Sequence, residues 1–150
     1  MADANIEYAN LTMADYPEVY ALWSGMPGIG LSSADSPEAI FVYLQRNPGM
    51  SFVARQKGKV VGAVLCGHDG RRGYLQHLAV SQEVRNRSIG RTLVEKCLEA
   101  LGDSGIKRCH IFVYQDNETG LGFWEAAGWF RRDDLLIMSH DLRTTSKKPS

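Results

Sequence analysis

The stretch YLQHLAVSQEVRNRSIGR, residues 74–91, decides how this chain folds. Its first half, residues 74–80, is rich in Tyr, Leu and Val and contains neither proline nor glycine, which is typical of a β-strand. A polar turn follows at residues 81–83, and after Gly90 the apolar residues recur with the period of a helix. The stretch therefore predicts a strand, a short turn and the first turn of a helix.

Three arginines, Arg85, Arg87 and Arg91, stand where this strand passes into this helix. The N–H groups in the first turn of a helix have no acceptor within the helix, and the helix dipole adds about half a positive charge there. Guanidinium groups add mobile positive charge and bind phosphate through two hydrogen bonds at once. The junction is therefore a candidate anion site, with an ordinary solvated turn as the alternative.

The junction resembles a known motif. Arg85-x-x-Ser88-x-Gly90 is similar to the (Gln/Arg)-x-x-Gly-x-(Gly/Ala) loop that binds the coenzyme A pyrophosphate in the GNAT N-acetyltransferase superfamily. Residues 78–80 (LAV) resemble the central strand of that family. Ser88 stands where the family usually has glycine, which permits close backbone approach and free φ.

A second segment resembles the same family independently. Residues 123–129 (FWEAAGW), with Asn117 seven positions before Trp124, are similar to the family segment Asn…(Phe/Tyr)-Tyr-x-x-x-Gly-(Phe/Tyr). The two motifs stand at the correct separation, and the resemblance covers nearly all of residues 6–142. The chain is identified on this basis as a member of the superfamily.

Hydrophobic periodicity predicts the order β-α-α-β-β-β-α-β-α-β-β. Strands are expected at residues 6–11, 51–55, 59–66, 74–80, 109–114, 129–132 and 135–142, and helices at 16–23, 37–46, 91–101 and 118–127. The strand at 109–114 follows a helix through a short connection, so it should run parallel to the central strand. The expected fold class is α/β (α+β). It is the GNAT fold: a mixed, mostly antiparallel seven-stranded sheet with a splayed central parallel pair, flanked by about four helices.

Composition indicates one soluble domain. The chain has 150 residues, with 17 Lys+Arg and 17 Asp+Glu, so the net charge is zero. This balance argues against a general nucleic-acid or membrane-surface binder. The N-terminus lacks the features of a signal peptide, and no apolar run reaches the length of a membrane span, so a cytoplasmic protein is expected. Residues 1–142 are expected to form the domain and residues 143–150 a disordered polar tail.

Cys66, Cys97 and Cys109 lie far apart and show no metal-ligand spacing. We interpret them as free thiols in a reducing compartment, and we expect no metal site.

The resemblance implies that acetyl-CoA (coenzyme A) is the co-substrate. The pantetheine amides would pair with the backbone of the central strand, as an added strand does, and the pyrophosphate would rest on backbone N–H groups of the loop. Asn117 would hold the pantetheine arm or cap the last helix, and Trp124 would pack on the cofactor. The implied cofactor-binding residues are Leu78, Ala79, Val80, Arg85, Asn86, Arg87, Ser88, Ile89, Gly90, Arg91, Asn117 and Trp124.

The implied reaction is direct attack of a primary amine, from a small molecule or a protein amino group, on the thioester. The Leu78 N–H is the candidate donor to the oxyanion. The positions of family bases fall on Gln76 and Tyr74, neither of which is a strong base, although both could hold a water relay. Strand alternation places His77 on the opposite face unless a bulge re-aims it, so a packed, hydrogen-bonded His77 is expected. The base is left unassigned.

The family tyrosine that protonates the departing sulfur is replaced by Trp124, whose indole is no acid at ordinary pH. Tyr114 is a second candidate, and coenzyme A thiolate can also leave unaided. A catalytically weak or inactive acyl-CoA-binding module is therefore the alternative function. The resemblance suggests that the first two helices and the loop joining them, residues 24–35, form the wall of the acceptor site, with a plain surface connection as the alternative. The last strand offers an edge for a possible homodimer.

Overall fold

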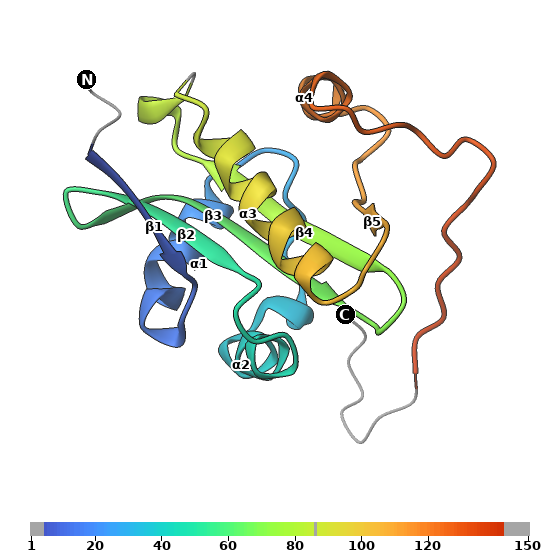
Figure 1. Ribbon diagram of the computed structural model, residues 1–150, viewed down its shortest axis with the longest axis horizontal. Coiled ribbons are helices and arrows are strands. Elements are labelled where there is room, and N and C mark those ends of the chain that lie inside the picture. Colours follow the sequence, from blue (N-terminus) through green and yellow to red (C-terminus); the bar gives the residue numbers. More distant parts are fainter. Residues whose placement is uncertain (1–4, 86, 143–150) are drawn as a thin grey trace.

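The computed structural model describes residues 5–85 and 87–142 (Figure 1). Its α-helices are α1 (Tyr16–Ser24), α2 (Pro37–Arg46), α3 (Ile89–Asp103) and α4 (Glu118–Ala126). Its strands are β1 (Ile6–Asn10), β2 (Phe52–Gln56), β3 (Lys59–His68), β4 (Gly73–Val80) and β5 (Cys109–His110). Short 3₁₀ turns occur at η2 (Met13–Asp15), η3 (Ser33–Asp35) and η4 (Gln82–Val84).

The strands form one sheet in the order β1-β2-β3-β4-β5. Neighbours run antiparallel except for β4 and β5, which are parallel. This confirms the fold class and the central parallel pair. The hairpin between β2 and β3 turns at Lys57 and Gly58, both with positive φ, as a tight two-residue turn requires.

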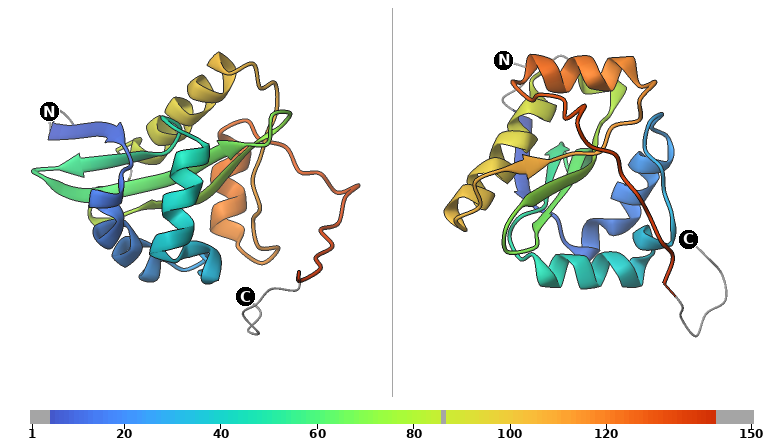
Figure 2. Two further views of the ribbon diagram at one scale, coloured as in Figure 1. Left: turned by 90° about the horizontal axis from the view of Figure 1, so that it is seen from below. Right: turned by 90° about the vertical axis from the view of Figure 1, so that its right-hand side faces the viewer.

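Helices cover both faces of the sheet, and each face has its own core (Figure 2). On one face, α3 packs through Ile89, Leu93 and Cys97. On the other, α1 contributes Val19 and Trp23 and α2 contributes Ile40. These residues recur at helical spacing on one side of each helix, which is why the sequence forms amphipathic helices over the sheet.

The strand count differs from the prediction. Five strands, not seven, occur in the described residues: β5 ends at His110, and residues 129–142 run without strand pairing. Trp129 packs on Trp124 of α4, with ring centroids 4.9 Å apart, and Arg131 pairs with Glu125. These contacts hold the start of the segment on α4, and a strand does not form without a partner edge for its hydrogen bonds. The predicted tail at residues 143–150 lies outside the described residues.

Candidate active site

The central parallel pair separates soon after it begins. In the described part of the chain, β4 and β5 pair at Gly73 with Cys109 and at Tyr74 with His110, and residues 111–114 then leave the sheet. The far half of β4 therefore has no strand on that side. This is the splayed pair that the resemblance predicted, and it exposes a backbone edge suited to an extended amide-containing ligand.

A β-bulge interrupts β4 at His77. The register against β3 skips one residue between Gln76 and Ala79, so that His77 and Leu78 share the position opposite Val64. His77 has a φ of 57°, a left-handed conformation that costs a non-glycine residue roughly 1–3 kcal/mol. The extra residue shifts the alternation of side chains along the strand by one.

The bulge re-aims the side chains of His77 and Leu78, which is the exception to strand alternation that the sequence analysis allowed for His77. Leu78 packs toward the α3 core and no longer shares a face with Gln76. His77 no longer points away, because it lines the same pocket as Gln76. The prediction of a packed, hydrogen-bonded His77 is confirmed. Regular alternation cannot reveal such a shift, since the bulge arises from pairing with β3 and from contacts made by α1.

His77 is paired with a buried carboxylate. Its Nε2 lies 2.9 Å from Oδ1 of Asp35, whose side chain is only 6% exposed. A carboxylate can only accept, so Nε2 carries the hydrogen and Nδ1 keeps a lone pair when the ring is neutral. The indole N–H of Trp23 donates to the His77 carbonyl at 2.9 Å, and the Trp23 ring meets the imidazole edge-on. The contacts with Asp35 and Trp23 therefore fix the position of the imidazole ring.

The surrounding turn fixes Asp35. Oδ2 of Asp35 accepts the N–H of Ser32 at 3.0 Å within a capping box, and the Asp35 carbonyl accepts the Tyr16 hydroxyl at 2.5 Å. The sequence carried a signal for this geometry, because Ser32-x-x-Asp35 is a capping pattern. It gave no indication that the free carboxylate oxygen would reach a histidine 42 residues away.

A pocket of about 330 Å³ opens at this pair. Its lining residues are Gly30, Ser32, Ala34, Asp35, Ile40, Tyr43, Leu65, Gln76 and His77. The hydroxyl of Tyr43 is buried and has no hydrogen-bond partner among the described residues. The residue types match those of small-molecule sites, an apolar floor with a few converging polar groups.

The loop after α1 reaches across to the segment that leaves β5. A Cβ at Gly30 would lie 2.3 Å from the Tyr114 hydroxyl, and one at Gly28 would lie 2.9 Å from Nδ2 of Asn117. A Cβ at either position would displace the side-chain end that it meets, so glycine permits this close approach. This places the Tyr114 hydroxyl at the rim of the pocket. Tyr74, by contrast, stacks on Phe112, with ring centroids 6.1 Å apart.

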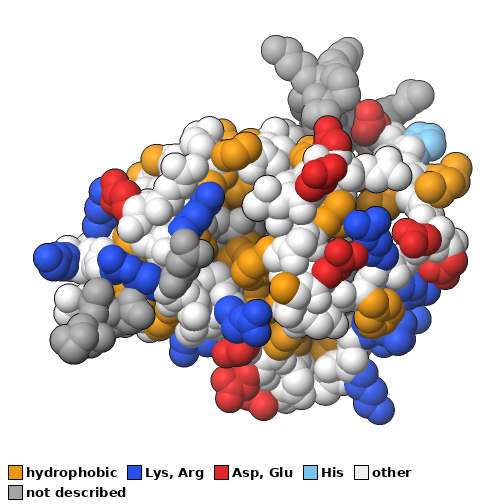
Figure 3. Space-filling view, turned by 90° about the horizontal axis from the view of Figure 1, so that it is seen from above, with side chains coloured by type: hydrophobic (Ala, Val, Ile, Leu, Met, Phe, Trp, Pro, Cys, Tyr) orange, Lys and Arg blue, Asp and Glu red, His pale blue; other side chains and the backbone are white. Residues whose placement is uncertain are grey.

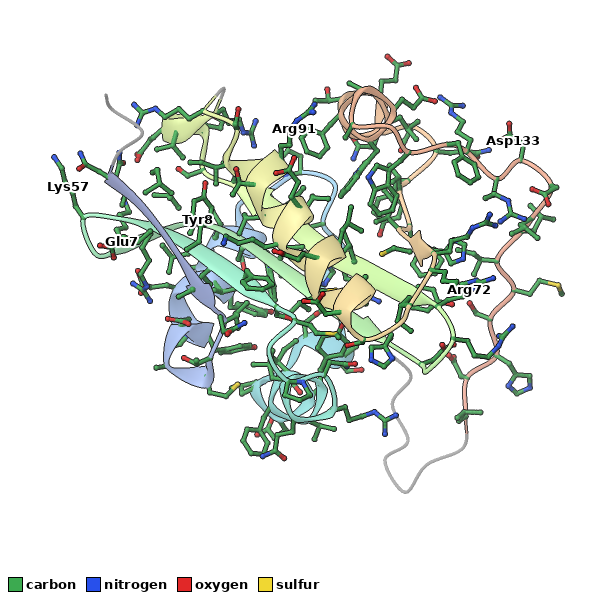
Figure 4. All side chains as sticks on the ribbon, viewed as in Figure 1. Glu7, Tyr8, Lys57, Arg72, Arg91 and Asp133 are labelled. Atoms are coloured by element: carbon green, nitrogen blue, oxygen red, sulfur yellow. The ribbon has the colours of Figure 1, made fainter. Side chains whose placement is uncertain are left out.

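The predicted phosphate loop lies between β4 and α3. Ser88 is the N-cap of α3 and has a φ of 61°, so the position does require the conformation that glycine adopts readily. Its carbonyl accepts both the N–H and the hydroxyl of Thr92. Arg85, Ser88 and Arg91 are exposed, Arg87 and Gly90 half-buried, and Ile89 buried in the core. Asn86 lies outside the described residues. Figure 3 looks onto this end of the molecule, and Figure 4 labels Arg91 at the start of α3.

Arg85 bends back toward the sheet. Its Nε donates to the Val80 carbonyl at 3.2 Å, and its Nη2 lies 3.3 Å from the sulfur of Met26. The carbonyl that we expected a pantetheine amide to use is thus occupied by an arginine side chain. Ala79 beside it is buried in the core over α1 and α2.

The last helix positions the second motif. Oδ1 of Asn117 accepts the N–H of Gly120 at 3.0 Å, so Asn117 caps α4, one of its two predicted roles. Trp124 is flanked by Phe123 and Trp129, with ring centroids at 5.1 and 4.9 Å. This aromatic packing fixes the position of the indole, and the packing of Trp124 on the cofactor stays a prediction.

None of the three cysteines lines the pocket. Cys66 and Cys97 are buried and Cys109 is half-buried, all as free thiols. Burial raises the pKa of the Cys109 thiol to about 12, which keeps it protonated. Within the described residues there is no cluster of three or more metal-ligating side chains. None of the helices described is both long and apolar enough to cross a membrane.

Comparison with known proteins points to one family. The profile of the acetyltransferase (GNAT) family matches residues 16–129. An acetyltransferase of Yersinia enterocolitica is 29% identical over 125 residues, which cover 83% of this chain and 87% of that protein.

Two solved structures share the fold. The PaiA N-acetyltransferase of Thermoplasma acidophilum, in complex with coenzyme A, aligns with a TM-score of 0.71 at 18% identity, over 85% of this chain and 91% of that one. An aminoglycoside acetyltransferase from an uncultured soil metagenomic sample, in complex with sisomicin, aligns with a TM-score of 0.73 at 16% identity. That alignment covers 95% of this chain and all (100%) of the other.

Proposed function

This chain belongs to the acetyltransferase (GNAT) family, and on that premise we propose that it transfers an acetyl group from acetyl-CoA to a primary amine by direct attack within a ternary complex. The observation that carries the proposal is the His77–Asp35 pair in a pocket beside the open edge of β4. It supplies the base that the sequence left unassigned. The volume of the pocket, about 330 Å³, favours a small-molecule amine over a protein amino group.

The acceptor must lose a proton before it can attack, because an alkylammonium has a pKa of roughly 10.4. His77 takes this proton at Nδ1, directly or through a water molecule. Asp35 holds the ring in the required tautomer and stabilises the imidazolium that forms, which is the role that a buried carboxylate plays toward a catalytic histidine. Gln76 lies on the same face and orients the amine or the water.

Two further groups complete the chemistry. The Leu78 N–H, in the bulge, donates to the oxyanion that forms on the thioester carbonyl. The Tyr114 hydroxyl, at the pocket rim by Gly30, donates a proton to the departing sulfur. Trp124 packs on the cofactor and does not replace the missing acid.

The residues present fit coenzyme A. The start of α3 offers first-turn N–H groups beside the exposed Arg85 and Arg91. A Cβ at Gly90 would contact Phe123 and Val80 at 3.5 and 3.6 Å, so a larger side chain there would fill the space between α3, α4 and β4. In the bound state Arg85 releases the Val80 carbonyl to a pantetheine amide and turns to the phosphates.

The cofactor site is tested by calorimetry with coenzyme A. Arg85→Ala should weaken coenzyme A binding about tenfold or more, because a charge-assisted hydrogen bond is lost. Gly90→Trp should also weaken binding, because the indole would fill the space between α3, α4 and β4. Arg46→Ala, an exposed arginine in the last turn of α2, is the matched control. Unchanged affinity in both loop variants would place the phosphates elsewhere.

The reaction is tested by release of free coenzyme A from acetyl-CoA across a panel of primary amines. We expect His77→Gln and Asp35→Asn to lower kcat/KM about 10²- to 10⁴-fold, the range for loss of a general base. The acidic limb of the pH–rate profile should disappear in His77→Gln and persist in the control His68→Gln. Tight coenzyme A binding without turnover on any amine would instead support the inactive binding module.

A further inference from the structure

Aromatic side chains adjoin the pocket along β4. Up to the bulge, β4 pairs with β3 in regular register, so its side chains alternate between the two faces of the sheet. Leu75 packs in the core beneath α3, whereas Gln76 lines the pocket on the opposite face. Tyr74 therefore lies on the pocket face, next to Gln76 along the same strand.

The segment that leaves β5 brings further aromatic rings to this face. His110 is paired in register with Tyr74, and their ring centroids lie 5.7 Å apart. Phe112 follows on the same face and stacks on Tyr74, with ring centroids 6.1 Å apart and an interplanar angle of 20°. Tyr114 comes next on that face and lies against Gly30, which lines the pocket. We call the stacked rings of Tyr74 and Phe112 the aromatic surface; it is continuous with the pocket through Gln76 and Tyr114.

The aromatic surface is open to a ligand. Phe112 is 60% exposed, although phenylalanine is among the residues most often buried. Two nearly parallel rings present a flat apolar face, and a further aromatic ring stacks favourably on such a face. A ligand bound in the pocket therefore has an apolar surface beside it to cover.

The aromatic surface lies at a distance from the proposed base. Tyr74 precedes His77 by three residues along β4, and at roughly 3.3 Å per residue this spacing corresponds to about 10 Å along the strand. An amine held at His77 therefore reaches the aromatic surface only through a linker of several bonds.

Charge decides which kind of group fits there. Burial and the positive charge of Arg132, Arg108 and Arg72 lower the pKa of His110, which shows how close these arginines lie to it. Arg132 pairs with Asp134, whereas Arg72 and Arg108 form no ion pair within the described residues. Figure 4 labels Arg72 close to β5. A second ammonium group is repelled from this end of the site, and an uncharged ring is not.

We propose that the aromatic surface binds the ring-bearing end of the acceptor, and that the acceptor is a primary amine joined by a short linker to a flat, uncharged ring. This inference rests on the proposed acetyl transfer to an amine at His77. Phe112 provides the exposed face on which the ring stacks, and its contact with Tyr74 holds that face in place. A polyamine is disfavoured, because its second ammonium group would meet the arginines around His110.

The test compares kcat/KM of the full-length protein for 4-phenylbutylamine and butylamine. Wild type should prefer the phenyl compound about tenfold or more, because only that compound reaches the aromatic surface. Phe112→Ala should bring the two values together and leave the value for butylamine unchanged, whereas Phe112→Trp should keep the preference. The control is Phe41→Ala, at an exposed phenylalanine of α2 that does not line the pocket; it should also keep the preference.

Charge at the same end is tested with two amines of equal length. Octylamine should be a better acceptor than 1,8-diaminooctane, because only the diamine carries a second ammonium group. A better rate with the diamine overturns the proposal.

Failure of this inference is distinct from failure of the proposed reaction. Equal values for 4-phenylbutylamine and butylamine in wild type, or an unchanged preference in Phe112→Ala, overturns the aromatic subsite and leaves acetyl transfer standing. If no amine is acetylated, the proposed reaction fails, and calorimetry with the same amines in the presence of coenzyme A tests the subsite alone. Wild type should then bind 4-phenylbutylamine about tenfold more tightly than butylamine. Equal affinities overturn the proposal, and this wild-type comparison stands even where a variant fails to fold.

Discussion

At the scale of single residues, three non-glycine residues among those described have positive φ: Lys57, His77 and Ser88. Lys57 occupies a hairpin turn, where this conformation belongs to the turn type. His77 is instead the proposed general base, and Ser88 lies in the loop that is proposed to bind the phosphates. Backbone strain of this kind persists only where surrounding contacts enforce it, and it gathers at functional sites. For His77 the enforcing contacts are those with Trp23 and Asp35.

Ser88→Gly should stabilise the fold by up to about 1 kcal/mol, because glycine adopts the left-handed conformation without the cost that serine bears. The gain is limited by the greater freedom of glycine in the unfolded chain. Urea unfolding measures the change, and calorimetry should show coenzyme A affinity equal to or above that of wild type. A large loss of affinity would mean that the serine hydroxyl is itself a phosphate ligand.

At the scale of elements, the close contact of α3 with the sheet depends on Gly62 in β3. A Cβ at this position would lie 3.1 Å from Cδ1 of Leu93 and 3.2 Å from Cγ2 of Ile89. Ile89 is the first residue of α3, so the same contact fixes the helix terminus on which the pyrophosphate is proposed to rest.

Gly62→Leu should destabilise the fold by about 1–3 kcal/mol through overpacking, with a simultaneous loss of coenzyme A affinity as α3 shifts. The control is Gly102→Ala, in α3 with no other atoms near the added Cβ; it should be neutral or slightly stabilising. Denaturant unfolding and calorimetry on the two variants give the comparison. A Gly62→Leu variant with wild-type stability would show that the sheet relaxes around the added side chain.

Asp15, which precedes α1, forms an ion pair with Arg55 of β2. Burial raises the pKa of this carboxyl, but hydrogen bonds from Thr12 and from Arg55 outweigh burial and leave the pKa below its usual value. A lowered native pKa stabilises the fold above the unfolded-state pKa, roughly 3.9 for Asp, and this contribution is lost as the pH falls toward the native value.

Asp15→Asn should therefore lower stability by about 1–2 kcal/mol at neutral pH, since a charge-assisted hydrogen bond is lost. The difference from wild type should shrink as the pH falls below about 4. Asp103→Asn, at an exposed aspartate in the last turn of α3, is the control and should show no such convergence. Thermal unfolding across this pH range is the measurement; a difference that stays constant with pH would exclude the ion pair as its source.

At the scale of the whole molecule, the described part of the sheet is open at β5, and residues 129–142 have no strand partner within it. The sequence predicted strands at residues 129–132 and 135–142, and the structure forms neither of them. Whether they become strands depends on an edge to pair with, which is a property of the assembled sheet and not of the segment itself.

The sequence alone determined the strand–turn–helix core, the order of the remaining helices and strands up to α4, and the family. These features depend on local stereochemistry and on the period of apolar residues along the chain, so they can be predicted from the sequence. The tertiary structure alone decided which face His77 occupies, its pairing with Asp35 and the course of residues 129–142. Each of these depends on contacts between residues far apart in the chain, and a single skipped residue in the register of β4 is enough to reverse which side chains enter the pocket.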